Sequence, residues 1–301
     1  TLAETYFALA QAYEYSLWKF REAEKYFKKA ISLNPNNAYA HYHYAWALVL
    51  FGRNKEALAE HLQARKYDPF APEIAAQLGW LYLHTGQKEK ALQEALKSLD
   101  LRPDYNQGLW GLGDVYLAMG KVEAAIATHK KLAEKYPAFI FKLGVTYAKA
   151  GKESEAAEIL KRMNTLKPNP FIALGFVMLN SALNNKDEAF KWLAYEPHHI
   201  WLPWVAVMDW GSNLHDDPRF DDFLNTPGAG ARPVHEATPN LVREVAPGLI
   251  YERYAAVRAF DSILESATLE QFHALRIEFK KLRYTMEFFQ EVLGPEARQV
   301  I

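Results

Sequence analysis

Four prolines in the first half of this 301-residue chain recur at a constant interval of 34 residues. They are Pro35, Pro69, Pro103 and Pro137. Two sets of small residues keep the same phase, namely Gly52, Gly86, Gly120, Ala57, Ala91 and Ala125. A fixed period of this size predicts a solenoid of stacked units, because the apolar positions of one unit cannot be buried without its neighbours.

Each period is typical of two helices joined by a tight turn. A glycine lies 17 residues before each of the last three prolines, where the first helix of a unit would end in a left-handed residue. Proline then ends the second helix, which it cannot continue. Gly79 and Gly113 lie seven residues before two of the turn glycines, where small residues let the two helices approach closely. The pattern predicts an all-α fold.

These units resemble tetratricopeptide repeats. The family pattern of Leu-Gly, Tyr, Gly, Ala and Pro is matched by "QLGWLYLHTGQKEKALQEALKSLDLRP" and "GLGDVYLAMGKVEAAIATHKKLAEKYP". The first unit has one extra residue in its turn, and the fifth unit is short enough to predict a shortened first helix. The resemblance covers residues 1–195 and implies a right-handed solenoid of helical hairpins, with five units and one degenerate unit.

The period breaks after residue 195. A solenoid needs an atypical end that covers its last apolar face. Trp201, Trp204 and Trp210 suit this role, so we expect a Trp-rich helical cap at 196–225. Residues 226–239 are rich in Pro, Gly and Ala and predict a linker.

The tetratricopeptide resemblance places the first helix of each unit along a concave groove. Carried over by position, the predicted peptide-contacting residues are Tyr39, Tyr42, Trp46, Trp80, His84, Trp110 and Asp114. Aromatic side chains provide a large contact area at low entropic cost, which favours a protein or peptide partner. Lysine and asparagine, which clamp a terminal carboxylate in some family members, are replaced here by Tyr42 and Trp46. The alternative is that these aromatic residues pack between neighbouring helices or cover a segment of the same chain.

Composition and motifs exclude several kinds of chemistry. The absence of cysteine excludes disulfides, thiol catalysis and Cys-ligated metal centres. No nucleophile elbow, zinc-protease helix or phosphate-binding loop is present, and the histidine spacing does not converge on a metal. We therefore expect no catalytic residues, no metal and no cofactor. The apolar runs are too short to span a membrane, which fits a cytoplasmic protein. The start at Thr1 without a methionine and the abrupt end at Ile301 favour a fragment of a longer protein.

The stretch "FHALRIEFKKLRYTMEFF" carries two parallel stripes at helical spacing. An apolar stripe predicts a packed seam, and its members are Phe272, Leu275, Phe279, Leu282, Met286 and Phe289. A cationic stripe runs beside it through His273, Arg276, Lys280 and Arg283. Thr268 and Gln271 have the spacing of a capping box, which predicts the start of this helix. Clustered Arg and Lys side chains suit a linear polyanion. The alternative is a solvated face that shields the seam.

This stretch resembles the conserved histidine α-helical domain, CHAD, an all-helical family associated with binding inorganic polyphosphate. The resemblance covers residues 240–301, the start of the family's second half, and implies a partial helical bundle. By motif position it implies phosphate contacts at His273, Arg276, Lys280, Lys281 and Arg283, with Arg258 on the preceding helix. Net charge is only −1, so a polyanion must be bound by local clustering, and nucleic acid is not the expected partner.

These observations lead to one hypothesis and two alternatives. The leading hypothesis is a non-enzymatic adaptor whose solenoid binds a protein or peptide and whose basic C-terminal helix binds inorganic polyphosphate or a similar polyanion. The first alternative is a pure protein-interaction scaffold whose C-terminal helices only pack or dimerise. The less favoured alternative is a phosphohydrolase, because the acidic residues near the basic stripe do not converge on one helix face.

Overall fold

The computed structural model describes residues 2–15, 19–195 and 202–225, and seven single positions nearer the C-terminus. These positions are Val257, Thr268, Gln271, Leu275, Arg276, Glu278 and Leu282. The chain divides into two compact units, 1–233 and 234–301. All regular secondary structure in the described residues is helical, which confirms the predicted all-α fold.

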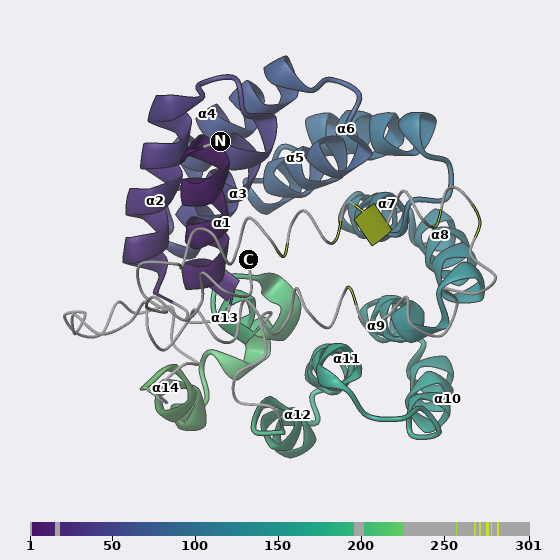
Figure 1. Cartoon of the computed structure of the whole chain (residues 1–301). Coiled ribbons are helices and arrows are strands. Elements are labelled where there is room, and N and C mark those ends of the chain that lie inside the picture. The colour runs from purple at the N-terminus through teal and green to yellow at the C-terminus, as the bar shows by residue number, and fades with distance from the viewer. Residues whose placement is uncertain are drawn as a thin grey trace. The chain divides into compact units, whose positions relative to one another are not determined.

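The first unit is a solenoid of helical hairpins (Figure 1). The hairpins pair α1 (Leu2–Tyr15) with α2 (Phe20–Leu33), α3 (Ala38–Leu50) with α4 (Asn54–Tyr67), α5 (Pro72–His84) with α6 (Lys88–Leu101), α7 (Asn106–Ala118) with α8 (Val122–Lys135), α9 (Ile140–Lys149) with α10 (Glu153–Met163), and α11 (Pro170–Ala182) with α12 (Lys186–Leu193). The first helix of each pair lies on the inside of an arc, and the second helix lies on the outside. The predicted concave groove is therefore the inner face, formed by the odd-numbered helices.

One turn geometry closes the hairpins from the second to the sixth. In the second hairpin, the Gly52 N–H donates to the Val49 carbonyl at 2.9 Å, and the Arg53 N–H donates to the Leu48 carbonyl at 3.0 Å. This pair of bonds satisfies the last helical carbonyls and needs a left-handed residue after the helix. Positive φ angles of 69–78° occur at Gly52, Gly86, Gly120 and Gly151. The sixth turn uses Asn184, with φ of 59°, because asparagine also tolerates this conformation.

Two irregularities of the repeat were predicted and are confirmed. The first hairpin has one more residue between its helices than the second, since α2 begins five residues after α1 ends and α4 begins four residues after α3 ends. The inner helix α9 has 10 residues, whereas α3, α5, α7 and α11 each have 13. A short 3₁₀ turn, η1 (Pro137–Phe139), precedes α9 and takes up the missing helical turn.

Small residues lie where paired helices approach most closely. A Cβ atom at Gly79 would lie 3.1 Å from the carbonyl oxygen of Ala91 and 3.1 Å from the backbone nitrogen of Ala95. At Gly113 a Cβ atom would lie 2.2 Å from Nε2 of His129. The predicted packing role of these glycines is therefore confirmed, and Gly113 makes room for a histidine ring.

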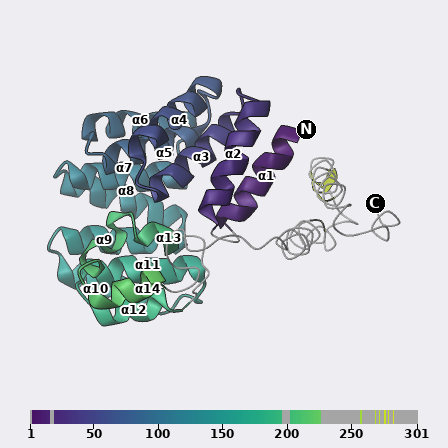
Figure 2. The same ribbon diagram turned by 90° about the vertical axis from the view of Figure 1, so that its left-hand side faces the viewer.

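The chain turns back after the sixth hairpin. The short helix α13 (Leu202–Val205) and the 3₁₀ segment η2 (Asp209–Leu214) lead to α14 (Pro218–Asn225). Figure 2 shows α14 near α12, and Arg219 connects the two helices. Its guanidinium donates to Asp187 at 2.7 Å and lies 4.3 Å from the ring centre of Phe190. Helix α14 therefore packs beside the last hairpin.

The described residues of the second unit include one helix start. The backbone N–H of Thr268 donates to Oε1 of Gln271 at 2.7 Å, and the N–H of Gln271 donates to Oγ1 of Thr268 at 3.2 Å. These reciprocal bonds are the predicted capping box, which is confirmed. The described positions that follow, from Gln271 to Leu282, are all helical.

Candidate functional site

Tryptophans line the inner face of the arc. Trp46 on α3 and Trp80 on α5 occupy the same position of successive repeats, and their ring centres lie 4.9 Å apart with nearly perpendicular planes. Trp110 on α7 lies one helical turn before the matching position and packs edge-on against Phe141 at 5.8 Å. These aromatic residues belong to the predicted groove, and successive inner helices place them side by side.

The chain's own residues 202–214, hereafter the groove segment, lie against these tryptophans. The ring centre of Trp204 lies 4.1 Å from that of Trp46, and the ring centre of Trp210 lies 5.7 Å from that of Trp110. Trp204 is only 2% exposed and Met208 is equally buried. The segment that carries Trp210 does pack on α11 of the last repeat, where the Asn213 amide donates to the Ser181 carbonyl at 2.8 Å, but its tryptophans also reach further along the groove. They contact the second and fourth repeats, while α14 lies beside α12; Trp201 falls outside the described residues.

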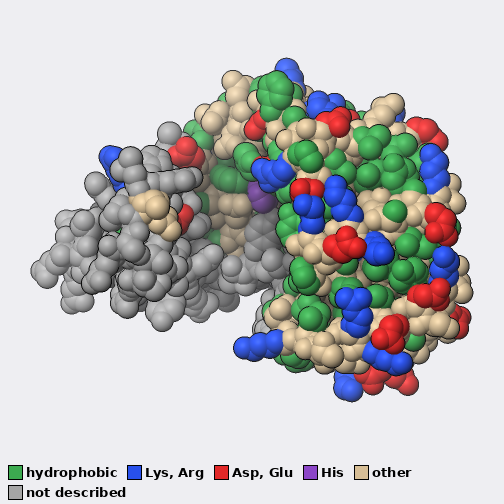
Figure 3. Space-filling view, turned by 90° about the vertical axis from the view of Figure 1, so that its right-hand side faces the viewer, with side chains coloured by type: hydrophobic (Ala, Val, Ile, Leu, Met, Phe, Trp, Pro, Cys, Tyr) green, Lys and Arg blue, Asp and Glu red, His purple; other side chains and the backbone are tan. Residues whose placement is uncertain are grey.

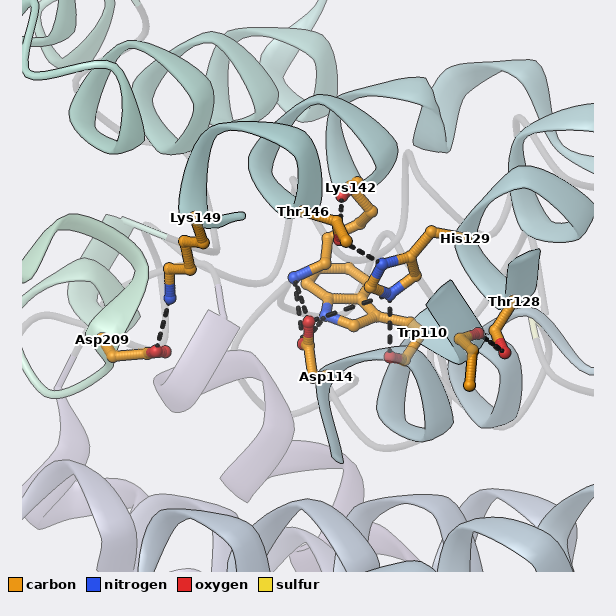
Figure 4. A network of polar contacts seen from close by, with 9 residues as sticks. Trp110, Asp114, Thr128, His129, Lys142, Thr146, Lys149 and Asp209 are labelled. Atoms are coloured by element: carbon orange, nitrogen blue, oxygen red, sulfur yellow. Dashed lines mark hydrogen bonds and ion pairs between the residues drawn. The ribbon is translucent and has the colours of Figure 1, made fainter. Parts of the chain in front are cut away.

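A polar network lies at the middle of the groove (Figure 4). The Lys142 ammonium approaches both carboxylate oxygens of Asp114, at 2.7 and 2.9 Å. The indole N–H of Trp110 donates to the same carboxylate at 2.7 Å, and the Lys142 ammonium lies 5.0 Å from the Trp110 ring centre. Lys142 is only 2% exposed, so its charge is neutralised inside the protein by a hydrogen-bonded partner.

A buried histidine, His129, lies beside this network and contacts Trp110. Nδ1 of His129 lies 2.6 Å from the hydroxyl oxygen of Thr146, and its Nε2 lies 3.2 Å from the carbonyl oxygen of Trp110. Burial lowers the pKa of His129 to about 4, although the Asp114 carboxylate opposes this shift. The imidazole is therefore neutral near pH 7, and it orients Trp110 without adding a charge.

A cavity of about 800 Å³ opens between the inner helices and η2. Its charged or aromatic lining includes Trp80, His84, Asp114, Lys142, Lys149 and Asp209. Lys149 on α9 and Asp209 on the groove segment form an ion pair at 2.9 Å across the lining, and both side chains are exposed. This volume is in the range of ligand-binding pockets, and its lining combines aromatic surface with charges of both signs.

A second, much smaller cavity of about 60 Å³ lies among the tryptophans. It is lined by Trp46, Trp80, Trp110 and Trp210, together with Gln77. The side-chain oxygen of Gln77 is buried and makes no hydrogen bond within the described residues. The contact between the groove segment and the groove is therefore not packed to the density of a protein core.

The other predicted groove residues have separate surroundings. Tyr42 is 7% exposed and packs edge-on against His43 and His61, at 4.8 and 5.7 Å between ring centres. Tyr39 lies at the rim, 41% exposed, where its hydroxyl donates to Glu73. Tyr42 thus contacts its own hairpin rather than a cavity, and Tyr39 connects two successive repeats.

Four charged residues of the large cavity were missed from the sequence, namely Lys88, Lys142, Lys149 and Asp209. Lys142 carried a usable signal, because it is the only charged residue in the first seven of the helix "IFKLGVTYAK". Asp209 carried another, as the only charged residue of the groove segment. Neither signal says which side chains meet, because their partners lie 28 and 60 residues away in the chain.

The predicted phosphate-contacting residues lie in the second unit. Arg276 is helical and exposed. The other predicted contacts lie outside the described residues, and these are Arg258, His273, Lys280, Lys281 and Arg283.

Two features are absent from the described residues. No group of three His, Asp or Glu side chains is arranged there to hold a metal ion. Likewise, no helix in this part of the chain combines the length and apolarity needed to cross a membrane. On the face that Figure 3 shows, acidic and basic side chains are interspersed.

Comparisons with known proteins match both parts of the chain. Tetratricopeptide repeat models match residues 19–74, 52–106 and 111–169, and the CHAD domain model matches residues 213–301. The CHAD match begins earlier than the expected 240–301 and includes α14 and the predicted linker. No curated protein matches the chain.

Several solved structures are similar to the solenoid. The crystal structure of PilW, described as a widely conserved type IV pilus biogenesis factor, has 19% identity and a TM-score of 0.51 over 71% of this chain and 99% of that one. Pseudomonas aeruginosa pilF has 18% identity and a TM-score of 0.48 over 71% and 96%. The MamA protein has 22% identity and a TM-score of 0.44 over 53% and 88%. The chain therefore carries tetratricopeptide repeats within residues 19–169, followed by a CHAD domain at 213–301.

Proposed function

We propose that this chain is a cytoplasmic, non-enzymatic adaptor. Its concave groove binds a protein or peptide, and its CHAD region binds inorganic polyphosphate or a similar polyanion. Tetratricopeptide repeats support the coarser statement, a protein-interaction scaffold. The observation that carries the groove half is the cavity of about 800 Å³, which lies directly beside Trp80 and Trp210 on the inner face.

The groove suits an extended chain better than a small metabolite. Its lining comes from four successive inner helices, α5, α7, α9 and α11, together with η2. Indole faces supply contact area, while Lys149 and Asp209 near the opening offer exposed charges of both signs. A peptide that lies across several repeats would use both kinds of surface.

The polyanion half depends on the basic stripe of the C-terminal helix. The CHAD match covers the whole motif, and the capping box fixes the start of its helix at Thr268. Arg276 is exposed eight residues after that start, where its guanidinium can donate two parallel hydrogen bonds to phosphate oxygens. A helix with several such groups on one face would follow a linear chain of phosphates.

Binding of inorganic polyphosphate to the full chain tests this half. We expect binding at low salt that weakens steeply as salt is added, because bound counterions are released. Arg276→Ala combined with Lys280→Ala should remove it, whereas the matched pair Lys161→Ala and Arg162→Ala on α10 should retain it. No binding at low salt, or equal loss in both pairs, would leave only the scaffold.

A displayed peptide library selected on the full chain tests the groove half. Selected peptides should lose at least tenfold in affinity for Trp80→Ala, because this indole lines both cavities. Peptides that bind Trp80→Ala as tightly as the unaltered chain would place the interaction surface outside the groove.

A further inference from the structure

We propose that the groove segment is a built-in mimic of the groove's external partner. This inference rests on the proposed function. The partner is a peptide segment of the same chemistry: an apolar stretch with two aromatic side chains, with one acidic residue directly before the second aromatic. Such a partner competes with residues 202–214 for the same tryptophans.

The segment has the composition of a peptide ligand. It reads "LPWVAVMDWGSNL", and Asp209 is its only charged residue. Its two large anchors, Trp204 and Trp210, are separated by one short helical turn and an extended residue, Met208. Tryptophan is the residue type most often found to dominate binding energy at interfaces, since it buries a large rigid area.

Its anchors reach three different repeats. Trp204 packs on Trp46 of the second repeat, and Trp210 packs on Trp110 of the fourth. Asp209 pairs with Lys149 of the fifth repeat at 2.9 Å. The groove segment also contacts the sixth repeat, where the Asn213 amide donates to the Ser181 carbonyl at 2.8 Å. A segment that merely covered the end of the solenoid would contact this last repeat alone. The groove segment instead lies across successive inner helices, as a bound peptide does.

The charges of the groove favour an acidic partner. Without the groove segment, the lining of the large cavity keeps the ammonium groups of Lys88, Lys142 and Lys149 against one carboxylate, that of Asp114. Asp209 supplies the second carboxylate. A partner that replaces this negative charge is favoured over one that does not, because it balances the excess of positive charge left in the groove.

The fit of the groove segment is incomplete, which makes it exchangeable. The cavity of about 60 Å³ among the tryptophans shows that this contact leaves space unfilled, and the buried oxygen of Gln77 in its lining makes no hydrogen bond within the described residues. A partner with a slightly larger side chain or a hydrogen-bond donor at this point gains contacts that the groove segment does not make. A tethered segment nonetheless competes at an effective concentration on the order of millimolar, so the partner must bind tightly.

The test uses the full chain and a fluorescein-labelled peptide with the sequence of residues 202–214. Anisotropy should show little binding to the unaltered chain, because its groove is occupied in cis. Trp204→Ala should bind the peptide at least tenfold more tightly, and Asp209→Lys should give a smaller gain. Asp209 is exposed, so this second variant keeps the fold intact. Arg219→Ala on α14, away from the groove, should bind no better than the unaltered chain.

Peptide variants supply the specificity control. Replacing both tryptophans of the free peptide by alanine should abolish binding to the Trp204→Ala chain, and replacing its aspartate by lysine should weaken binding at least threefold. The inference is overturned if both opened chains keep their circular dichroism spectrum and neither binds the free peptide.

The outcome separates this inference from the proposed function. If the affinity of a protein partner is unchanged by the free peptide and by Trp204→Ala, the proposed function stands and the inference of mimicry is wrong. If the peptide enters the opened groove while no peptide from any library binds the full chain, the groove half of the proposed function fails, and the partner half of this inference fails with it.

Discussion

The concave groove has two stretches that differ in how completely other residues of the chain fill them. In the filled stretch, Trp46 is covered by Trp204, and both indoles are almost fully buried. In the open stretch, a cavity of about 800 Å³ remains beside Asp114 and Lys142. Both stretches are made of equivalent inner helices. The difference lies in side chains, since the filled stretch is apolar and the open stretch contains a buried ion pair with its hydrogen-bond partners.

This difference shows how one solenoid face can combine stability with exchange. Apolar contact with the groove segment stabilises the filled stretch through the area removed from water. The open stretch is stabilised from within, because Asp114 is satisfied by Lys142 and Trp110 of the solenoid itself. Four variants or conditions would sharpen or break this comparison, from the largest expected effect to the smallest.

The largest effect is expected from Trp204→Ala in the filled stretch. Removal of a fully buried tryptophan should cost about 3–5 kcal/mol of the free energy of unfolding, measured by urea denaturation of the first unit's transition. The matched variant Leu117→Ala removes a half-buried side chain that lines the open cavity, and it should cost about 1 kcal/mol. Equal losses would mean that the two stretches are packed alike.

The ion pair of the open stretch gives the next effect. Lys142→Met leaves the Asp114 carboxylate with only the indole N–H of Trp110, so unfolding free energy should fall by about 3 kcal/mol. Adding Asp114→Leu should restore most of this loss, because no unpaired charge then remains. The double variant thus separates the cost of an orphaned carboxylate from the net contribution of the pair. A double variant as unstable as Lys142→Met contradicts the account.

Acidification should lower the free energy of unfolding through two buried histidines, one beside each stretch. Burial lowers the pKa of His61 to about 3 and that of His129 to about 4, against 6.5 in the unfolded chain. Their contribution is present above pH 6.5 and is lost as the pH falls toward these values, because only the unfolded chain takes up the protons. Each histidine should cost about 2 kcal/mol of stability at pH 5.

Urea denaturation at pH 7 and pH 5 measures this loss, and His61→Phe should reduce it. His41 supplies the contrast. Burial disfavours its charged form, but hydrogen bonds to Glu60 and to the carbonyl of Pro35 outweigh burial and raise its pKa. Its contribution is complete below pH 6.5 and is lost as the pH rises through the raised value. Stability independent of pH between 5 and 7 contradicts the buried neutral histidines.

The smallest effect is expected at the exposed pair of Lys149 and Asp209. Lys149→Ala should lower the free energy of unfolding by less than about 1 kcal/mol, because water and salt screen the pair. The loss should disappear in 1 M salt. A loss as large as that of Lys142→Met would mean that the groove segment is held by charge rather than by its tryptophans.

Local sequence patterns predicted the regular part of the molecule well. The turn glycines, the short α9 and the extra residue in the first turn follow from chain geometry, which acts over a few residues. Even the degenerate sixth unit keeps its turn, because Asn184 adopts the left-handed conformation that Gly52 adopts in the second unit. The capping box of Thr268 and Gln271 is a local pattern of the same kind.

The candidate site was predicted only in part. The groove tryptophans could be placed on the inner face because repeat position decides which way a side chain points. The role of the last two tryptophans could not. Trp204 and Trp210 carry the same apolar surface whether they cover the sixth repeat or enter the groove, and nothing in the local pattern distinguishes these outcomes. Likewise, Lys142 could be recognised as unusual but not paired with Asp114.

The sequence by itself determined the all-α solenoid, its period and its turns, because helix capping, glycine conformation and small-residue packing depend on near neighbours. Only the tertiary structure decided that residues 202–214 return to the groove. That outcome depends on contacts between residues far apart in the chain, such as Trp110 with Trp210. The free energy of these contacts comes from the combined shape and charge of several repeats. The repeats of a solenoid can be predicted from local sequence, whereas the segment that occupies its groove is determined by the whole inner face.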